Sequence, residues 1–99
     1  MIRILCVAAF LTAPLSSANA TGRMTCAPVD PVNWIIQEDL TNKLISSGWS
    51  VRFIKEDGSC WEVYGTDEEG RRVEGYFHPE TGEKLLVAQR GRILFRAQD

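Results

Sequence analysis

Residues 49–96 read WSVRFIKEDGSCWEVYGTDEEGRRVEGYFHPETGEKLLVAQRGRILFR, and this stretch decides the fold. Glycine returns in it as Gly58, Gly70 and Gly82, twelve residues apart, and once more as Gly91. Apolar and polar residues alternate between these glycines, which is typical of strands that bury one face. Because glycine adopts the positive φ that closes a three-residue hairpin loop, the spacing predicts a meander of five antiparallel strands.

Three-residue loops that end at each glycine also predict a register, since directly opposed residues lie on the same face of a sheet. The four loops place apolar residues together on a face that is expected to be buried: Trp49, Val51, Phe53, Trp61, Val63, Val73, Phe77, Leu85, Val87, Ile93 and Phe95. Gly65 and Gly75 fall on this face too, where the missing side chains leave room for a helix or for Trp49.

The opposite face of the predicted sheet, called the outer face below, is mostly polar. It carries Arg52, Glu62, Tyr64, Arg72, Glu74 and Tyr76. Arg52 is expected directly across from Glu62, an opposite-charge pair that supports the register weakly. The strand that begins near Trp49 is expected to be an edge, because a meander leaves its first and last strands unpaired on one side.

One helix is predicted before the strands. Asp30 is a suitable N-cap, and Pro31 stands at the first helical position, where its missing N–H costs nothing. Apolar residues then recur at steps of four, as Val32, Ile36, Leu40 and Leu44, and Gly48 is placed to end the helix. The predicted fold class is α+β, with one N-terminal helix packed on one face of an antiparallel meander of four to five strands.

The start of the chain has the three parts of a secretory signal peptide. Arg3 gives a positive start, residues 4–15 are almost entirely apolar, and Ala18 and Ala20 frame a small-residue cleavage site. We therefore expect residues 1–20 to be a signal peptide, 21–29 a leader segment and 30–99 the folded domain. The expected location is the periplasm or the extracellular space, with no membrane-spanning segment after cleavage.

The cysteines predict one disulfide. Cys6 lies in the signal peptide, and the remaining pair, Cys26 and Cys60, would be oxidised in an exported protein. The strand register puts Cys60 on the outer face, away from the helix that follows Cys26. Either a bulge near Ser59 or a leader that wraps the sheet edge would reconcile the two.

Charge and motifs exclude several classes of function. Removal of Arg3 with the signal peptide leaves 10 of the 11 basic residues against 13 acidic ones, a net charge of −3 that disfavours nucleic-acid binding. We expect no cofactor, no metal site and no catalysis, since His78 stands alone beside Pro79. One alternative is a small metal-binding or carboxylate-dependent hydrolytic protein that uses Glu62, Glu74 and His78. Another is a structural protein of the envelope.

Binding of a protein partner fits the outer face better than chemistry does. Tyrosine and arginine are enriched where proteins bind one another, and this face offers two of each. We therefore take Arg52, Glu62, Tyr64, Arg72, Glu74 and Tyr76 as the candidate partner-binding surface.

Three segments of the chain resemble the PepSY domain, and most of all its small secreted single-domain members. They are WSVRFIK at 49–55, CWEVYG at 60–65 and GRRVEGYFHPETGE at 70–83, with Trp61 where the family usually has tyrosine. The resemblance covers roughly residues 30–87. It implies a helix-on-sheet fold related to segments of thermolysin-type peptidase propeptides. It also implies a non-catalytic module that binds a peptidase and inhibits or modulates it.

Overall fold

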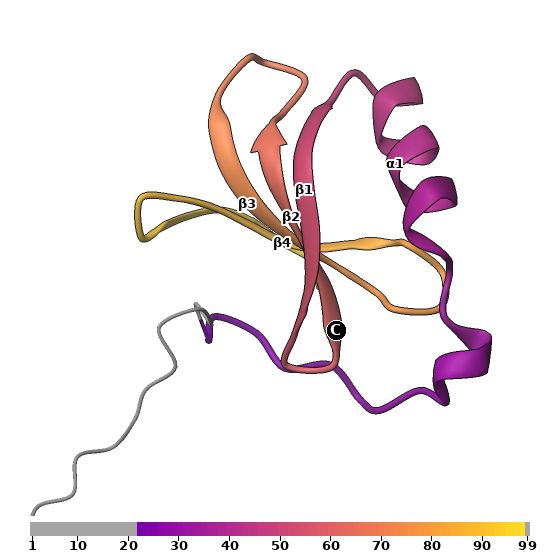
Figure 1. The fold of residues 1–99 in the computed structure, drawn as a ribbon. Helices are drawn as coiled ribbons and strands as arrows, with labels where there is room; N and C mark the ends of the chain where they lie inside the picture. The colour runs from indigo at the N-terminus through magenta and orange to yellow at the C-terminus, as the bar shows by residue number, and fades with distance from the viewer. Residues whose placement is uncertain (1–21, 99) are drawn as a thin grey trace, which may run out of the picture.

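The computed structural model describes residues 22–98, so the predicted signal peptide lies outside the described residues. The strands β1 (Ser50–Asp57), β2 (Cys60–Thr66), β3 (Arg72–Phe77), β4 (Lys84–Gln89) and β5 (Arg92–Arg96) form one antiparallel sheet. Each strand pairs with the next along the chain, so the predicted five-stranded meander is confirmed, with β1 at one edge and β5 at the other. The helix α1 (Gln37–Ser46) lies on one side of the sheet (Figure 1).

The helix begins later than the sequence predicted. The Asp30 side chain does accept a hydrogen bond, from the Val32 amide at 3.1 Å, but it caps only the 3₁₀ turn η1 (Pro31–Asn33). Residues 34–36 are held by the sheet instead: the Ile35 amide donates to the Pro79 carbonyl at 2.8 Å, and Trp61 Nε1 donates to the Ile35 carbonyl at 2.9 Å. The prediction of an N-terminal helix is therefore wrong, because α1 is internal and follows an irregular segment of residues 22–36.

The late start changes which apolar residues are buried. Leu40 and Leu44 pack into the core, whereas Val32 is 81% exposed and Ile36 57%. The predicted end of the helix is confirmed, since Gly48 has φ 98° and the Trp49 amide donates to the Leu44 carbonyl at 3.0 Å.

The main core lies between α1 and the inner face of the sheet. Its buried members are Leu40, Leu44, Trp49, Val63, Val73, Phe77 and Val87. Gly75 makes room for two of the aromatic rings, as predicted. A Cβ at that position would lie 2.7 Å from Phe77 and 2.9 Å from Trp49.

The register is as predicted in the middle of the sheet. Between β2 and β3, Trp61 pairs with Phe77 and Val63 with Gly75. Between β3 and β4, Gly75 pairs with Val87, but a bulge next to the turn pairs Phe77 with Lys84. Leu85 was therefore placed on the wrong face, and it packs against the outer cluster described below.

The first and last hairpins have two-residue loops, where three were predicted. Gly58 and Ser59 have φ of 61° and 67°, and Arg90 and Gly91 have φ of 50° and 85°, the positive pairs of a type I′ turn. A loop one residue shorter reverses the faces of the residues next to it.

Two members of the predicted buried face are consequently on the outer side. Phe53 pairs with Tyr64, and Ile93 pairs with Ala88. The predicted pair of Arg52 and Glu62 is also wrong, because Lys55 stands opposite Glu62. A bulge in each hairpin then restores the predicted faces farther from the turn, where Val51 pairs with Gly65 and Phe95 with Val87.

The leader reaches the outer face by passing the turn between β1 and β2 (Figure 1). The Cys26 amide donates to the Gly58 carbonyl at 2.7 Å, and the predicted disulfide between Cys26 and Cys60 is present. A second buried cluster forms beneath the leader, made of Cys26, Cys60, Tyr76, Leu86 and Ala88 with Met24 and Leu85 packed against it. Of the two ways to reconcile Cys60 with the register, the structure has the wrapped leader.

Candidate functional site

The leader divides the outer face into a covered half and an open half. Glu62 and Tyr76, two of the six residues predicted to bind a partner, are 0% exposed, and Tyr76 lies beneath the leader. A partner protein has no access to either side chain while the leader is in place. The prediction that they belong to a solvated surface is therefore wrong, because sequence parity gives the face of a residue and not what covers that face.

Tyr76 is part of the attachment of the leader. Its hydroxyl donates to Asp57 Oδ2 at 2.8 Å and accepts from the Arg23 amide at 3.4 Å. The same carboxylate oxygen accepts from the Gly22 amide at 3.3 Å. Burial, together with the hydrogen bond to Asp57, raises the pKa of Tyr76 well above its ordinary value. The phenol therefore stays protonated and keeps donating at any physiological pH.

Glu62 lies against Lys55 and Tyr64 at the border of the two halves. Lys55 Nζ is 3.9 Å from Glu62 Oε1 and 5.7 Å from the centre of the Tyr64 ring. Burial raises the pKa of Tyr64, and the negative charge of Glu62 beside it adds to that effect. Both aromatic hydroxyls of this face are thus neutral groups suited to hydrogen bonding.

The open half keeps the other four predicted residues together. Arg52, Tyr64, Arg72 and Glu74 line a hollow of about 220 Å³, which also includes Gly65, Val73, Ala88 and Arg90. We call this the outer hollow. Arg90 was not among the residues predicted for this surface. A two-residue loop at Arg90 and Gly91 would have placed it here, but the prediction assumed a longer loop.

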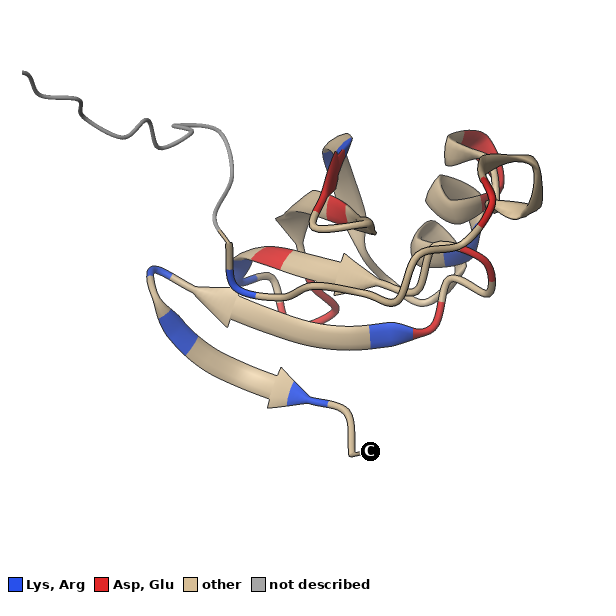
Figure 2. Cartoon of the chain, turned by 90° about the horizontal axis from the view of Figure 1, so that it is seen from below, with Lys and Arg blue, Asp and Glu red and all other residues tan. Residues whose placement is uncertain are grey.

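The outer hollow is rich in positive charge. Glu74 accepts a hydrogen bond from Arg23 Nε at 3.5 Å, and thus forms an ion pair with the leader. Within residues 22–98, no ion pair involves Arg52, Arg72 or Arg90. Figure 2 shows a similar excess of basic residues along β4 and β5, where basic segments occur without acidic ones. The sequence from Lys84 to Gln98 contains no aspartate or glutamate.

An aromatic pair borders the outer hollow. Phe53 stacks on Tyr64 with ring centres 4.5 Å apart and an interplanar angle of 12°. Phe53 remains 47% exposed, so its ring adds apolar surface next to the hollow. The open half thus combines aromatic surface with guanidinium groups, the composition that dominates binding energy at protein interfaces.

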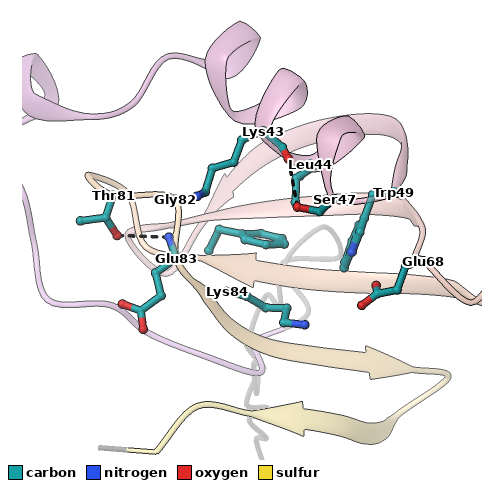
Figure 3. A pocket seen from close by; sticks show the side chains of 10 residues that line it. Lys43, Leu44, Ser47, Trp49, Glu68, Thr81, Gly82, Glu83 and Lys84 are labelled. Atoms are coloured by element: carbon teal, nitrogen blue, oxygen red, sulfur yellow. Dashed lines mark hydrogen bonds between the residues drawn. The ribbon is translucent and has the colours of Figure 1, made fainter.

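A second groove lies on the other side of the sheet, between α1 and the turn from β3 to β4 (Figure 3). It measures about 570 Å³, and its apolar base is formed by Leu44, Trp49 and Phe77. Charges of both signs surround the base, with Lys43 and Lys84 balanced by Glu68 and Glu83. The mixed rim gives this groove no preference for one sign of ligand charge.

The residues of the hydrolytic alternative are not brought together. Glu62 is fully buried, and Glu74 is paired with Arg23. His78 belongs to the turn between β3 and β4, where its Nδ1 accepts from the amides of Glu80 and Thr81 at 3.1 and 3.3 Å. Among residues 22–98, no group of three or more histidine, cysteine or acidic side chains could hold a metal ion.

The carboxylate of Asp67 has a structural role. Asp67 Oδ1 accepts from the amides of Glu69 and Arg71, both at 2.9 Å, and Asp67 Oδ2 lies 2.8 Å from the Arg71 guanidinium. Burial alone would raise the pKa of Asp67, but the hydrogen bonds and charge of Arg71 outweigh it, so the pKa is lowered. Asp67 fixes the turn between β2 and β3.

Comparison with known proteins places the chain in a family. The model of the peptidase propeptide and YPEB domain, PepSY_2, matches residues 4–86. The chain belongs to this family. Neither the curated proteins nor the solved structures contain a match. The PepSY match takes in the leader, α1 and the strands as far as Leu86 in β4, so Arg90 and all of β5 lie beyond it.

The PepSY region contains no candidate membrane span in the part that the structure describes. Between residues 22 and 98, no helix has the length and apolar character that a bilayer crossing needs.

Proposed function

We propose that this PepSY protein is an exported, non-catalytic module that binds a peptidase and modulates its activity, as a peptidase propeptide does. The observation that carries the proposal is the family match over residues 4–86. The disulfide between Cys26 and Cys60 supports export, because such bonds persist in oxidising compartments. Residues 1–20 serve as the signal peptide in this proposal, and residues 30–99 as the binding domain.

The open half of the outer face is the proposed contact surface. It retains Arg52, Tyr64, Arg72 and Glu74 from the sequence prediction, and it gains Phe53 and Arg90. Glu62 and Tyr76 leave the surface because both are fully buried, and Tyr76 also holds the leader. Exposed aromatic and arginine side chains around a hollow are the features that anchor protein partners.

A photo-cross-linking experiment tests the proposal. A benzophenone amino acid replaces Tyr64 in one variant and Glu80 in the control, since Glu80 is exposed in the turn between β3 and β4. After irradiation in the exporting cells, we expect a peptidase cross-linked from position 64 and not from position 80. The purified peptidase should then change its rate when the PepSY protein is added, and less so with the Arg72→Ala variant.

Two results would contradict the proposal. One is that position 64 yields cross-links to no peptidase at physiological salt. The other is that the cross-linked peptidase keeps the same rate at every concentration of the PepSY protein.

A further inference from the structure

The three arginines of the outer hollow come from separate parts of the chain. Arg52 belongs to β1, Arg72 begins β3, and Arg90 lies in the turn between β4 and β5. Ala88, which also lines the hollow, has a small side chain and takes up little of its space. The sheet thus gathers three cations around one hollow, and the outermost two, Arg52 and Arg90, are 38 residues apart in sequence.

Two of the three arginines occupy irregular backbone positions. Arg52 is the extra residue of the bulge between Val51 and Phe53, and bulges redirect a side chain out of the regular pleat. Arg90 has φ 50°, a left-handed conformation at which glycine or asparagine is preferred in a type I′ turn. At position 90, arginine is thus not the residue that the backbone favours.

Gathering the three charges is also electrostatically unfavourable. Like charges near one another repel, and within residues 22–98 none of the three has an ion pair. Glu74 is the one acidic residue that lines the hollow, and Arg23 already lies against it. An anionic ligand would remove this repulsion, and carboxylates match the planar fork of arginine.

We propose that the outer hollow is a binding site for an acidic extended peptide, whose carboxylates contact Arg52, Arg72 and Arg90. The stacked pair of Phe53 and Tyr64 beside the hollow covers the apolar side chains of the same peptide. This exposed aromatic surface favours a peptide over a free phosphate ion, which has no apolar part to cover. The inference deepens the proposed function by naming the partner chemistry of that surface, and in this respect it rests on it.

Titration of the isotope-labelled protein by nuclear magnetic resonance tests the site directly. The protein is produced from the full-length chain in an oxidising compartment, so that the disulfide forms. The probe is a short acetylated and amidated peptide of alternating glutamate and valine, and the matched control has glutamine in place of glutamate. We expect the glutamate peptide to shift the amides around Tyr64, Arg72 and Arg90, and the glutamine peptide to bind at least about fivefold more weakly.

Substitutions separate a binding role from a structural one. Arg72→Gln and Arg90→Asn should each weaken the glutamate peptide about fivefold, the effect of one exposed charge pair. Arg96→Gln removes the same charge from the far end of β5, outside the hollow, and should change the affinity less than twofold. Arg90→Asn should also raise the unfolding midpoint, because asparagine suits the left-handed turn better. Loss of binding in this variant then cannot come from a damaged fold.

The proposal is overturned by any of three results: equal affinity for the two peptides, equal weakening by Arg96→Gln and Arg90→Asn, or inorganic phosphate that occupies the hollow while the glutamate peptide does not. Higher salt should weaken the glutamate peptide, since exposed charges are screened. No peptidase enters this titration. Failure here would leave peptidase modulation standing, and failure of the cross-linking experiment would leave the acidic-peptide site standing.

Discussion

Replacing Cys26 and Cys60 together by alanine tests how the leader is held. The disulfide links positions 34 residues apart, and in the chain-entropy treatment a loop of that length stabilises the fold by about 3.8 kcal/mol at room temperature. For a domain of this size, that corresponds to a fall in Tm of roughly 15–30 °C. Alanine is preferred to serine, because a buried hydroxyl without a partner would add its own cost.

Urea unfolding followed by tryptophan fluorescence measures the effect. Trp34, Trp49 and Trp61 all lie within the folded part, so the signal reports the sheet and the helix together. We expect a lower midpoint and a larger dependence of unfolding free energy on urea, since an unfolded chain without the cross-link exposes more surface. Hydrogen exchange at the amide of residue 26, which donates to the Gly58 carbonyl, follows the leader separately.

The wild-type protein in reductant is the matched control and should behave as the double variant does. A loss of less than about 1 kcal/mol in both samples would refute the chain-entropy reasoning. A reductant that destabilised the double variant as well would show that the effect does not come from this disulfide.

Three further predictions follow from single contacts. Tyr76→Phe removes the buried hydrogen bond to Asp57 and should cost about 1–2 kcal/mol in urea unfolding, so an unchanged midpoint would contradict the role given to the hydroxyl. The lowered pKa of Asp67 means that its contribution is present above its ordinary value of 3.8 and is lost as the pH falls below it. Asp67→Asn should therefore lower Tm at neutral pH and little at about pH 3, and a deficit of equal size at both would refute the assignment. Gly65→Ala should destabilise the protein by about 2 kcal/mol or more in the same urea assay, because the added Cβ would meet a backbone carbonyl of β1. A loss of stability below about 0.5 kcal/mol would contradict this prediction and show that β1 and β2 can move apart at this position.

The sequence predicted the sheet correctly where the residues of a turn are enough to decide its loop length. Gly70 ends a three-residue loop with φ 80°, and the register between β2 and β3 follows from it. The disulfide between Cys26 and Cys60 was predicted from the cysteines that remain once Cys6 is assigned to the signal peptide. The PepSY motifs lie in these same segments, which is why the family could be recognised before the fold was known.

The errors of register occur next to the turns, and those at the first and last hairpins share one cause. Loops of two and three residues both accept glycine, so Gly58 and Gly91 alone do not tell which loop forms. Phe53 and Ile93 were therefore assigned to the wrong face. The bulges that restore the pattern farther along β1 and β5 have no distinct sequence signal, because they depend on how each strand must bend to pack.

The helix was misplaced for a related reason. Asp30 and Pro31 are sound signals for a helix start, and locally they do form a turn. The chain then leaves the helical path because Ile35 is bonded to Pro79 and to Trp61, and those bonds join residues 26 or more apart. Local propensity is weak compared with several such tertiary contacts.

Tertiary structure also decided which residues of the candidate site are exposed. The sequence by itself predicted that Tyr64, Arg72 and Glu74 share the outer face, because parity along a strand is a local property and the register between β2 and β3 is as predicted. Arg52 lines the same hollow as the extra residue of a bulge, which parity does not predict. The sequence did not determine that Glu62 and Tyr76 would be fully buried, or that Arg90 in a tight turn would line the same hollow as Arg72. The burial of these side chains and the place of Arg90 depend on how segments far apart in the sequence pack together. Packing energy is a property of the folded chain as a whole and not of any one stretch of its sequence.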